Sequence, residues 1–548
     1  MSAECYPMSI LPHVSKLHAD YLAMGEQGTP TLLRNYYGSK PDSGEWMKGT
    51  ARIGDTHALA DALNHQASGF RAGEQSLKNI VKIREGARVV VTGQQVGLLG
   101  GPLLTLLKAA TAIARAQEAT TATGVAHVPV FWLATEDHDL AEVDHISLLS
   151  KHAVETLRLG LHSEGAEVGG LRLGEGIVAV LEHSSELLGH APICDLLHDC
   201  YRPDATLGSA FGRWMTQLFA SYGLIVLDAS GPEFHKLGRA TLRFAIEHAE
   251  ELELALLRRA AELTEAGYHA QVLVKPGSSL LFLVSDGQHG AKPRQALRRS
   301  VDGSWKAGGR GYSTAELLRI LEREPERLSP NALLRPVFQD TILPTAAYVG
   351  GPAEIAYFAQ TAVLYQHIFQ DGEALGRVTP VLPRFSATLI EPLVAALMAK
   401  DDLRLDDIFA AKTVDALTHR LGARSMPIEA KRRLGAVGNA MHDEVEALTS
   451  YLCAMDESLG RSAMVSASKM RYQMNRLRRL AATFEVQKNN SLRKQAHTMM
   501  LHLFPSEHPQ ERILGGVWFL AQAGEGLIDT LVREALTMCL GHTVLKIT

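Results

Sequence analysis

A short run of β-branched residues that leads through a glycine-rich loop into an apolar helix constrains the fold of this chain more than any other feature. Residues 89–91 are three valines, which is typical of a buried strand, and Pro102 precedes a run rich in Leu and Ala. Proline at the first helical position already has the helical backbone conformation. A helix that begins directly after such a loop presents free backbone N–H groups to an anion.

We therefore expect this loop to bind a nucleotide or another anionic group. The residues expected to hold that group are Thr92, Gly93, Gln94, Gln95, Gly100, Gly101 and Lys108. The glycines would equally permit a tight turn between strand and helix without any ligand. Because the loop matches neither the Walker A nor the Gly-x-Gly-x-x-Gly pattern, its sequence alone does not identify the ligand.

A second strand-like run, residues 128–134, leads into Glu136, Asp137, His138 and Asp139. In open α/β sheets, ligands bind just beyond the carboxyl ends of the strands. Carboxylates at such a place can bind an ammonium group or Mg²⁺, and a histidine can act as a base near neutral pH. We expect all four residues to be catalytic, with His138 as the general base and Asp137 and Asp139 orienting it or binding a cation. The alternative is a capped helix start.

A third block combines polar side chains with glycines between a strand and a helix. It contains the candidate substrate-binding residues Gln339, Asp340, Tyr348, Gly350, Gly351 and Glu354. Two helix N-termini that face one cleft could hold a carboxylate-rich substrate. For Tyr348 the alternative of packing in the core remains open.

Strand-like and helix-like runs alternate from about residue 86 to 380, which predicts an α/β fold with a doubly wound parallel sheet. The predicted core strands are residues 89–92, 128–134, 224–228 and 346–350, and the predicted helices are 103–116, 234–263 and 353–369. Residues near 147–220 and 265–330 do not fit this alternation, so we interpret them as insertions. The second insertion is predicted to contain a hairpin of residues 271–275 and 280–285, joined by Pro276 and Gly277.

Beyond Pro383 the sequence becomes helical. Apolar residues recur at intervals of three and four on both sides of Gly460, which predicts an antiparallel helical hairpin with a coiled-coil seam. These predicted seam positions are Leu434, Val437, Met441, Val445, Leu448, Leu452, Met455, Leu459, Ala463, Ala467, Met470, Met474, Leu477, Ala481 and Phe484. We therefore divide the chain into residues 1–383, the core with its insertions, and 384–548, a helical coiled-coil domain.

Composition narrows the possible classes of function. The chain has 548 residues, 46% of them apolar and 21% charged, which is ordinary for a globular protein. Its net charge of −5 argues against nucleic acid as the main partner, and a basic cluster near residues 471–494 is interpreted as a solvated helix face. The sequence contains neither an apolar run of about 20 residues nor a signal peptide, so we expect a cytoplasmic protein without a membrane partner.

The five cysteines are scattered along the chain, and their odd number favours reduced thiols over a disulfide framework. Cys194 and Cys200 flank His198 at a spacing loosely able to ligate a metal ion. We favour a helix with two small, half-buried thiols at these positions. No zinc site is therefore expected.

The three blocks together resemble the BshC family of cysteine ligases in bacillithiol biosynthesis. The resemblance rests on TGQQVGLLGGPLLTLLKAATAI at residues 92–113, PVFWLATEDHDLAEVDH at 129–145, and RPVFQD with LPTAAYVGGPAEIAY at 335–340 and 343–357. Shorter matches lie at residues 11–16, 503–505 and 510–512. The blocks span the whole chain.

Membership of this family implies a Rossmann-like core with connecting-peptide insertions and a C-terminal coiled coil that forms a homodimer. It implies that glucosaminyl-malate and L-cysteine are joined through an amide bond, with ATP as the expected activating group and Mg²⁺ as a candidate ion. The motifs of class I synthetases are missing from the sequence, so adenylate chemistry does not follow. Two alternatives stay open: a nucleotidyl- or sugar-phosphate transferase on the same scaffold, and a non-catalytic coiled-coil binding protein.

Overall fold

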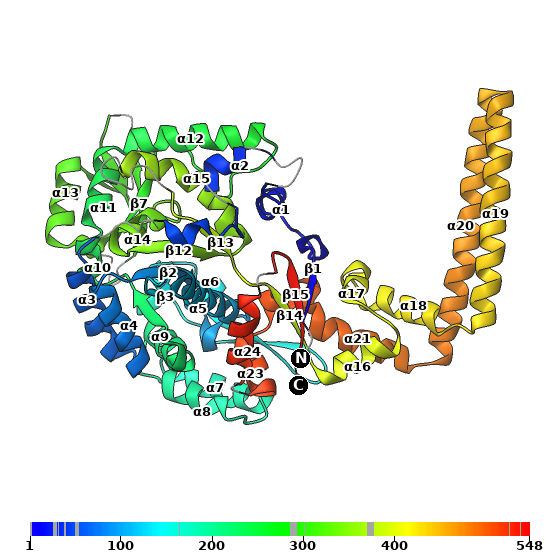
Figure 1. Ribbon diagram of the computed structural model, residues 1–548, viewed down its shortest axis with the longest axis horizontal. Coiled ribbons are helices and arrows are strands. Elements are labelled where there is room, and N and C mark those ends of the chain that lie inside the picture. Colours follow the sequence, from blue (N-terminus) through cyan, green and yellow to red (C-terminus); the bar gives the residue numbers. More distant parts are fainter. Residues whose placement is uncertain are drawn as a thin grey trace.

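A five-stranded sheet in which all neighbouring strands are parallel forms the centre of the molecule (Figure 1). The computed structural model describes residues 3–25, 30, 32–37, 40–49, 54–163, 165–284, 293–300, 302–369, 378–524, 526–537 and 539–547. From edge to edge the strands are β13 (Val381–Pro383), β12 (Thr345–Gly350), β2 (Arg88–Gln94), β3 (His127–Leu133) and β6 (Ile225–Asp228). All four predicted core strands are present, and the predicted doubly wound parallel sheet is confirmed.

Both faces of this sheet are buried, which explains why its strands are nearly continuous apolar runs. In β3, Val130 and Trp132 pack into one core while Phe131 and Leu133 pack into the other. Helix α5 (Leu104–Thr123) covers the second face, and α3 (Thr56–Gly69), α4 (Glu74–Arg84) and α15 (Pro352–Ile368) contribute to the core of the first. Helices α5 and α15 correspond to the predicted helices 103–116 and 353–369.

The single helix predicted for residues 234–263 is wrong. The structure has three helices there, α10 (Pro232–Leu237), α11 (Arg239–Glu247) and α12 (Ala249–Glu265). At Gly238, between the first two, an added Cβ would collide with the ring of Phe338. The chain therefore needs glycine at this break, because the helix pair packs directly on an aromatic side chain.

The two predicted insertions fold as separate substructures. The first contains the hairpin β4 (His145–Leu149) and β5 (Val154–Arg158), followed by α7 (Gly176–Leu187), α8 (Ile193–Cys200) and α9 (Leu207–Leu218). The second contains an antiparallel sheet in the order β10 (Arg310–Tyr312), β9 (Trp305–Ala307), β8 (Arg294–Arg299), β7 (Ser278–Val284) and β11 (Leu328–Pro330), with α13 (Thr314–Arg323) beside it.

The hairpin predicted in the second insertion is wrong, because its second strand pairs with other segments than its first. Strand β7 pairs with β8 and β11, not with residues 271–275. The backbone of Val272 is instead held by the side chain of Gln360, which accepts from its N–H and donates to its carbonyl. The side chain of Gln360, on α15, thus makes the two hydrogen bonds that a neighbouring strand would have made with Val272. Ser285, the end of the predicted hairpin, lies outside the described residues.

A small third sheet joins the two ends of the chain. Strand β15 (His542–Lys546) lies between β1 (Ala3–Tyr6) and β14 (Ala387–Ile390), so both termini lie close together (Figure 1). A disulfide links Cys5 to Cys539. The expectation of reduced thiols is therefore wrong for this pair, because the pairing of β1 with β15 brings together two cysteines that are 534 positions apart. Cys194 and Cys200 are free and buried, and His198 bonds to Ser185.

A long helical hairpin projects from the rest of the molecule (Figure 1). It consists of α19 (Ile428–Met455) and α20 (Glu457–Lys488), which pack along each other and confirm the coiled coil. The turn lies at Asp456 and not at Gly460, where it was predicted. Gly460 packs so closely on the backbone of Cys453 that an added Cβ would collide with it, so the glycine permits close helix contact. Several predicted seam positions are exposed: Val437, Leu448, Met455, Leu459, Met470, Leu477 and Phe484.

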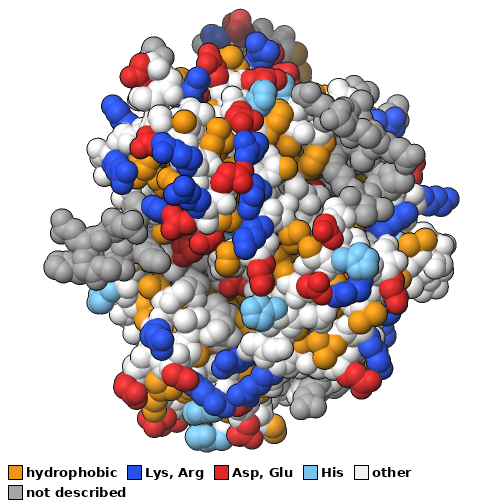
Figure 2. All heavy atoms as spheres, turned by 90° about the vertical axis from the view of Figure 1, so that its left-hand side faces the viewer, with side chains coloured by type: hydrophobic (Ala, Val, Ile, Leu, Met, Phe, Trp, Pro, Cys, Tyr) orange, Lys and Arg blue, Asp and Glu red, His pale blue; other side chains and the backbone are white. Residues whose placement is uncertain are grey.

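Other helices surround the sheets. They are α1 (Lys16–Leu22), α2 (Leu32–Tyr37), α6 (Leu140–Val143), α14 (Arg335–Ile342), α16 (Pro392–Lys400), α17 (Leu405–Ala411), α18 (Val414–Ser425), α21 (Ser491–Leu503), α22 (Gln510–Ile513), α23 (Gly516–Ala523) and α24 (Gly526–Leu536). Four of them, α1, α6, α14 and α22, carry residues that line the cavities described below. Within the described part of the chain, no helix has the length and apolarity to cross a bilayer. On the face around α10 and α13, acidic and basic side chains are interspersed (Figure 2).

Candidate active site

A cavity of about 500 Å³ opens beyond the carboxyl ends of β2, β3 and β12. It brings together residues from all three sequence blocks, as the crevice rule for parallel sheets predicts. Its lining residues are Gly93, Gln94, Gln95, Leu104, Lys108, Trp132, Ala134, Asp137, Glu142, Arg335, Tyr348, Gly351, Pro352, Ala353, Glu354, Tyr357, Arg384 and Arg512.

A buried ion pair between Lys108 and Glu354 forms one wall. The Lys108 ammonium lies 2.5 Å from Glu354, 2.7 Å from the carbonyl of Gly93 and 2.9 Å from Oε1 of Gln94. Burial lowers the pKa of Lys108, although Glu354 opposes this shift. Burial alone would raise the pKa of Glu354, but Lys108 holds it below its ordinary value. These three acceptors use all three N–H donors of the ammonium. Lys108 therefore holds α5 against α15 and has no N–H left to donate to a ligand.

The N-terminus of α5 is covered by the chain itself. The N–H of Leu103 donates to the carbonyl of Leu514 at 2.8 Å, and the N–H of Gly516 donates to the carbonyl of Gly101 at 3.0 Å. Gly100 donates to Tyr201, and the Thr92 hydroxyl donates to the carbonyl of Val349. The structure therefore does not bring Thr92, Gly100 and Gly101 to the cavity, whereas Gly93, Gln94, Gln95 and Lys108 line it.

The four residues after β3 separate into different environments. Asp137 lines the cavity, where the side-chain amide of Gln95 donates to it at 2.8 Å and also donates to Glu142. His138 is about half exposed and is not a lining residue of the cavity; its Nδ1 lies 3.6 Å from Asp137 Oδ1 and its ring packs against Phe282. Asp139 is exposed at the start of α6.

Glu136 points away from the cavity into a buried cluster. Its carboxylate bonds to Nε2 of His235 at 2.9 Å, and the histidine ring is fully buried. Arg294 lies close enough to lower the pKa of Glu136, and Glu167 lies close enough to raise that of His235. Burial and the negative charge of Glu136 raise the pKa of Glu167 to about 7. Burial likewise raises the pKa of Asp228, which accepts a hydrogen bond from Thr135.

The third block supplies one wall of the cavity and the support behind it. Tyr348 donates to Glu354 at 2.5 Å and stacks on Phe358, while the N–H of Gly351 donates to Glu354 at 2.7 Å. Gly350 lies beside the cavity, where its carbonyl accepts from the N–H of Arg384.

Gln339 and Asp340 are buried behind that wall and are not lining residues. Gln339 accepts from Arg335 at 3.3 Å and donates to Asp340 at 3.2 Å. The other carboxylate oxygen of Asp340 accepts from Tyr365 at 2.6 Å. These two residues therefore hold Arg335 in place.

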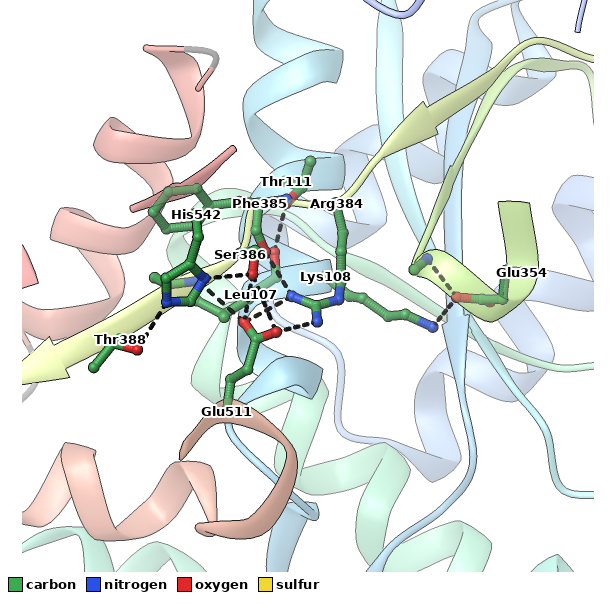
Figure 3. Close-up of polar contacts among 12 residues, drawn as sticks. Leu107, Lys108, Thr111, Glu354, Arg384, Phe385, Ser386, Thr388, Glu511 and His542 are labelled. Carbon is green, nitrogen blue, oxygen red and sulfur yellow. Dashed lines mark hydrogen bonds and ion pairs between the residues drawn. The ribbon is translucent and has the colours of Figure 1, made fainter. Parts of the chain in front are cut away.

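Three arginines that the sequence analysis did not assign also line the cavity: Arg335, Arg384 and Arg512. Arg384 is paired with Glu511, while the Lys108 ammonium lies against Glu354 (Figure 3). Arg335 bonds to the hydroxyls of Tyr357, at 2.5 Å, and Tyr348, at 3.4 Å. Within the described residues, neither Arg335 nor Arg512 has an ion-pair partner. Arg335 and Arg512 lie within the stretches that resemble the BshC family, at residues 335–340 and 510–512. That position was the one sign in the sequence that they could belong to the site.

The cavity is therefore polarised. Arg384 follows β13 and Asp137 follows β3, and two strands separate β13 from β3. At about 4.8 Å per strand, the ends of β13 and β3 lie about 14 Å apart. Arg335 and Arg512, which have no ion-pair partner among the described residues, line the same cavity as Asp137 and Glu142. A ligand with an amine at one end and carboxylates at the other matches this arrangement.

No group of three or more His, Cys, Asp or Glu side chains is arranged to hold a metal ion in the described ranges. On the cavity wall, the carboxylates of Asp137 and Glu142 both accept from the amide of Gln95.

The fold and the site define a Rossmann-like α/β protein with an added coiled coil and a polar crevice at its strand ends. The family model "Bacillithiol biosynthesis BshC, N-terminal Rossmann-like domain" matches residues 1–377, and "Bacillithiol biosynthesis BshC, C-terminal coiled-coil domain" matches residues 387–547. The chain belongs to the BshC family.

Similar proteins carry the name "Putative cysteine ligase BshC". The protein of Koribacter versatilis is 40% identical and that of Solibacter usitatus 33% identical, each over 100% of both chains. The protein of Salinibacter ruber is 30% identical over 90% of both chains. The names of these relatives support a ligase.

Proposed function

We propose that this protein joins L-cysteine to glucosaminyl-malate through an amide bond, in the last step of bacillithiol biosynthesis in the cytoplasm. The observation that carries the proposal is the polarity of the cavity. Arg335 and Arg512 give it a basic side without ion-pair partners among the described residues, and Asp137 and Glu142 give it an acidic side. Glucosaminyl-malate carries an amine and carboxylates, which are the groups that these two sides would bind.

In this arrangement the two substrate ends are fixed by different side chains. The malyl carboxylates bind Arg335 and Arg512, because guanidinium groups make charge-assisted, often bidentate hydrogen bonds to carboxylates. The sugar amine lies at Asp137. A nucleophilic amine must be neutral, so a base has to accept a proton from its ammonium form. We assign that role to His138, which Asp137 orients from 3.6 Å.

The cysteine carboxylate has to be activated before an amine can attack it, and ATP is the proposed co-substrate that supplies this activation. Gln94 and Gln95 line the cavity and would bind it, with Glu142 as the candidate ligand of Mg²⁺. At the N-terminus of α5 the N–H of Leu103 is bonded to Leu514, so this donor is not free for a phosphate. The nucleotide would therefore be held by side chains in the cavity.

The test is to incubate the purified protein with cysteine, glucosaminyl-malate and ATP, and to follow the amide product and AMP or ADP by mass spectrometry. We expect Arg335→Gln to raise the KM for glucosaminyl-malate by about 10-fold or more, since it removes a charged hydrogen-bonding group. Arg243→Gln, in an exposed ion pair on α11, is the matched control. Transfer of a nucleotidyl group to a sugar phosphate without amide formation would instead support the transferase alternative.

We also propose that the protein is a homodimer joined through α19 and α20. Apolar side chains cover these helices on the outside, including Leu448, Tyr451, Tyr472 and Leu477, each more than half exposed. Large exposed apolar patches are typical of protein interfaces. We expect the variant Leu448→Lys, Leu477→Lys to shift the protein from dimer to monomer in light scattering. A wild-type protein that is monomeric at high micromolar concentration would contradict this proposal.

A further inference from the structure

A second, much smaller chamber adjoins the cavity. Its volume is about 40 Å³, and it shares Pro352, Arg384 and Arg512 with the lining of the cavity. Its other wall is the N-terminal segment around Leu11–Val14 and His18. A volume of this size holds a few water-sized groups, so it can accept one small polar group but no larger ligand.

The chamber contains hydrogen-bonding groups that the protein leaves unused. His18 is only 2% exposed, and within the described residues both of its ring nitrogens lack a hydrogen-bond partner. Leaving buried polar atoms unbonded costs free energy, so such atoms normally meet water or a ligand. The chamber is thus completed by something other than the described protein side chains.

The charges around the chamber favour an anion as that partner. Glu511 already neutralises Arg384 and is saturated, since it also accepts from Ser386 and from the N–H of Ala387 (Figure 3). Arg512 has no such carboxylate. Burial and the neighbouring Arg384 lower the pKa of Arg512, and burial together with both arginines lowers the pKa of His18 to about 4. The ring of His18 is therefore neutral at pH 7 and can donate one N–H.

We infer that this chamber is an anion subsite, in which His18 and Arg512 hold one carboxylate or phosphate group of a ligand whose body lies in the cavity. The inference rests on the proposed function in one respect, that the ligand in the cavity is anionic. Under that function, the group is a malyl carboxylate or a phosphate of ATP. His18 is then a specificity-determining residue, because its ring N–H donates to an anionic group only where the ligand places that group in the chamber beyond the cavity.

Calorimetry with malate, lactate and inorganic phosphate tests the subsite. Malate and lactate differ by one carboxylate, so lactate reports on the cavity without the chamber. We expect His18→Phe, which keeps a ring but removes both nitrogens, to weaken malate by about 10-fold or more and lactate by less than about 2-fold. Arg512→Gln should act in the same direction. His127→Phe replaces another buried histidine that lines neither space and serves as the control.

The probes also separate the two sources of the anionic group. A loss confined to malate assigns the chamber to a carboxylate, and a loss confined to phosphate assigns it to a phosphate group.

If both variants fold, as judged by melting, and bind malate and phosphate as the wild type does, the chamber holds only water and the inference is wrong. Wild-type turnover with an unaffected His18→Phe variant overturns the subsite but not the proposed function. If the wild type shows no turnover but its binding of malate depends on His18, the proposed function is overturned and the subsite is not.

A second readout follows from the charge of the ring. A bound anion stabilises the protonated imidazole, so malate should raise the pKa of His18 from about 4. NMR titration of labelled histidine rings with and without malate measures this shift. A His18 signal that malate leaves unchanged contradicts the inference.

Discussion

Two clusters of charged side chains lie beyond the carboxyl ends of strands in the same parallel sheet, and only one of them lines the cavity of the candidate site. At β2 and β12, Lys108 and Glu354 satisfy each other while Arg335 and Arg512 face open space. Beside β3 and β6, Glu136 and His235 form a buried pair with Glu167 and Arg294 nearby. In the open cluster Arg512 has no ion-pair partner among the described residues. In the closed cluster Glu136 is bonded to Nε2 of His235, whose Nδ1 has no hydrogen-bond partner among those residues. A place at a strand end therefore does not by itself create a site, and the two clusters differ in that only the first lines the cavity.

The sharpest test of this contrast compares neighbouring residues of one tetrapeptide. We expect Asp137→Asn and His138→Ala to lower turnover by about 10²–10⁴-fold, since one lines the cavity and the other is the proposed base. Glu136→Gln should lower turnover far less, because its side chain is turned toward His235. The measurement is kcat and KM for amide formation, with melting temperature as the control for folding.

The relative sizes of these effects refine the assignment. A large loss for Asp137→Asn with a small one for His138→Ala would transfer the role of base to Asp137. A large loss of kcat for Glu136→Gln, with an unchanged melting temperature, would show that the closed cluster takes part in the reaction.

The closed cluster should instead appear in the pH dependence of stability. The pKa of Glu167 is raised from 4.5 to about 7, so the folded state binds this proton more tightly than the unfolded state does. Through this group the wild type gains stability as pH falls from about 7 to 4.5, and the cost of the buried charge is fully present above pH 7. Glu167→Gln removes that cost and should stabilise the protein at pH 8 by up to about 3 kcal/mol.

The difference should approach zero well below pH 4.5, where the wild-type carboxyl is protonated in both states. Melting temperatures at pH 5 and pH 8 measure the effect, and Glu182→Gln, an exposed glutamate on α7, is the matched control. Equal stabilisation by Glu167→Gln at both pH values would mean that charge burial is not the cause.

The sequence predicted the sheet well because each core strand is a continuous apolar run bounded by glycine or polar residues. It also placed Gln95, Asp137 and Glu354 in one crevice, since the carboxyl ends of parallel strands share an edge. It could not predict that Asp137 and Glu136 turn to opposite sides, because this depends on His235, about 100 positions away. For the same reason Arg384 was missed. Its place on the cavity wall depends on Glu511, which lies 127 positions further along the chain.

The glycines of the first loop show the same limit, and they provide the smallest of the expected effects. Gly101 has φ +69° and ψ −166°, a backbone conformation that is essentially restricted to glycine. An added Cβ would meet Thr105 only at an ordinary distance of 3.4 Å, so the cost of Gly101→Ala lies in the backbone. We expect a loss of about 1–3 kcal/mol in stability without a change in malate or ATP binding.

Gly69→Ala is the control, because that glycine ends α3 in open space without a positive φ. Calorimetric melting and ligand titration of both variants make the comparison. Weaker ligand binding by Gly101→Ala at an unchanged melting temperature would show that the loop approaches a ligand after all. In that case residues 514–516 would have to move away from the N-terminus of α5 when the ligand binds, because the carbonyl of Gly101 is bonded to Gly516 in this structure.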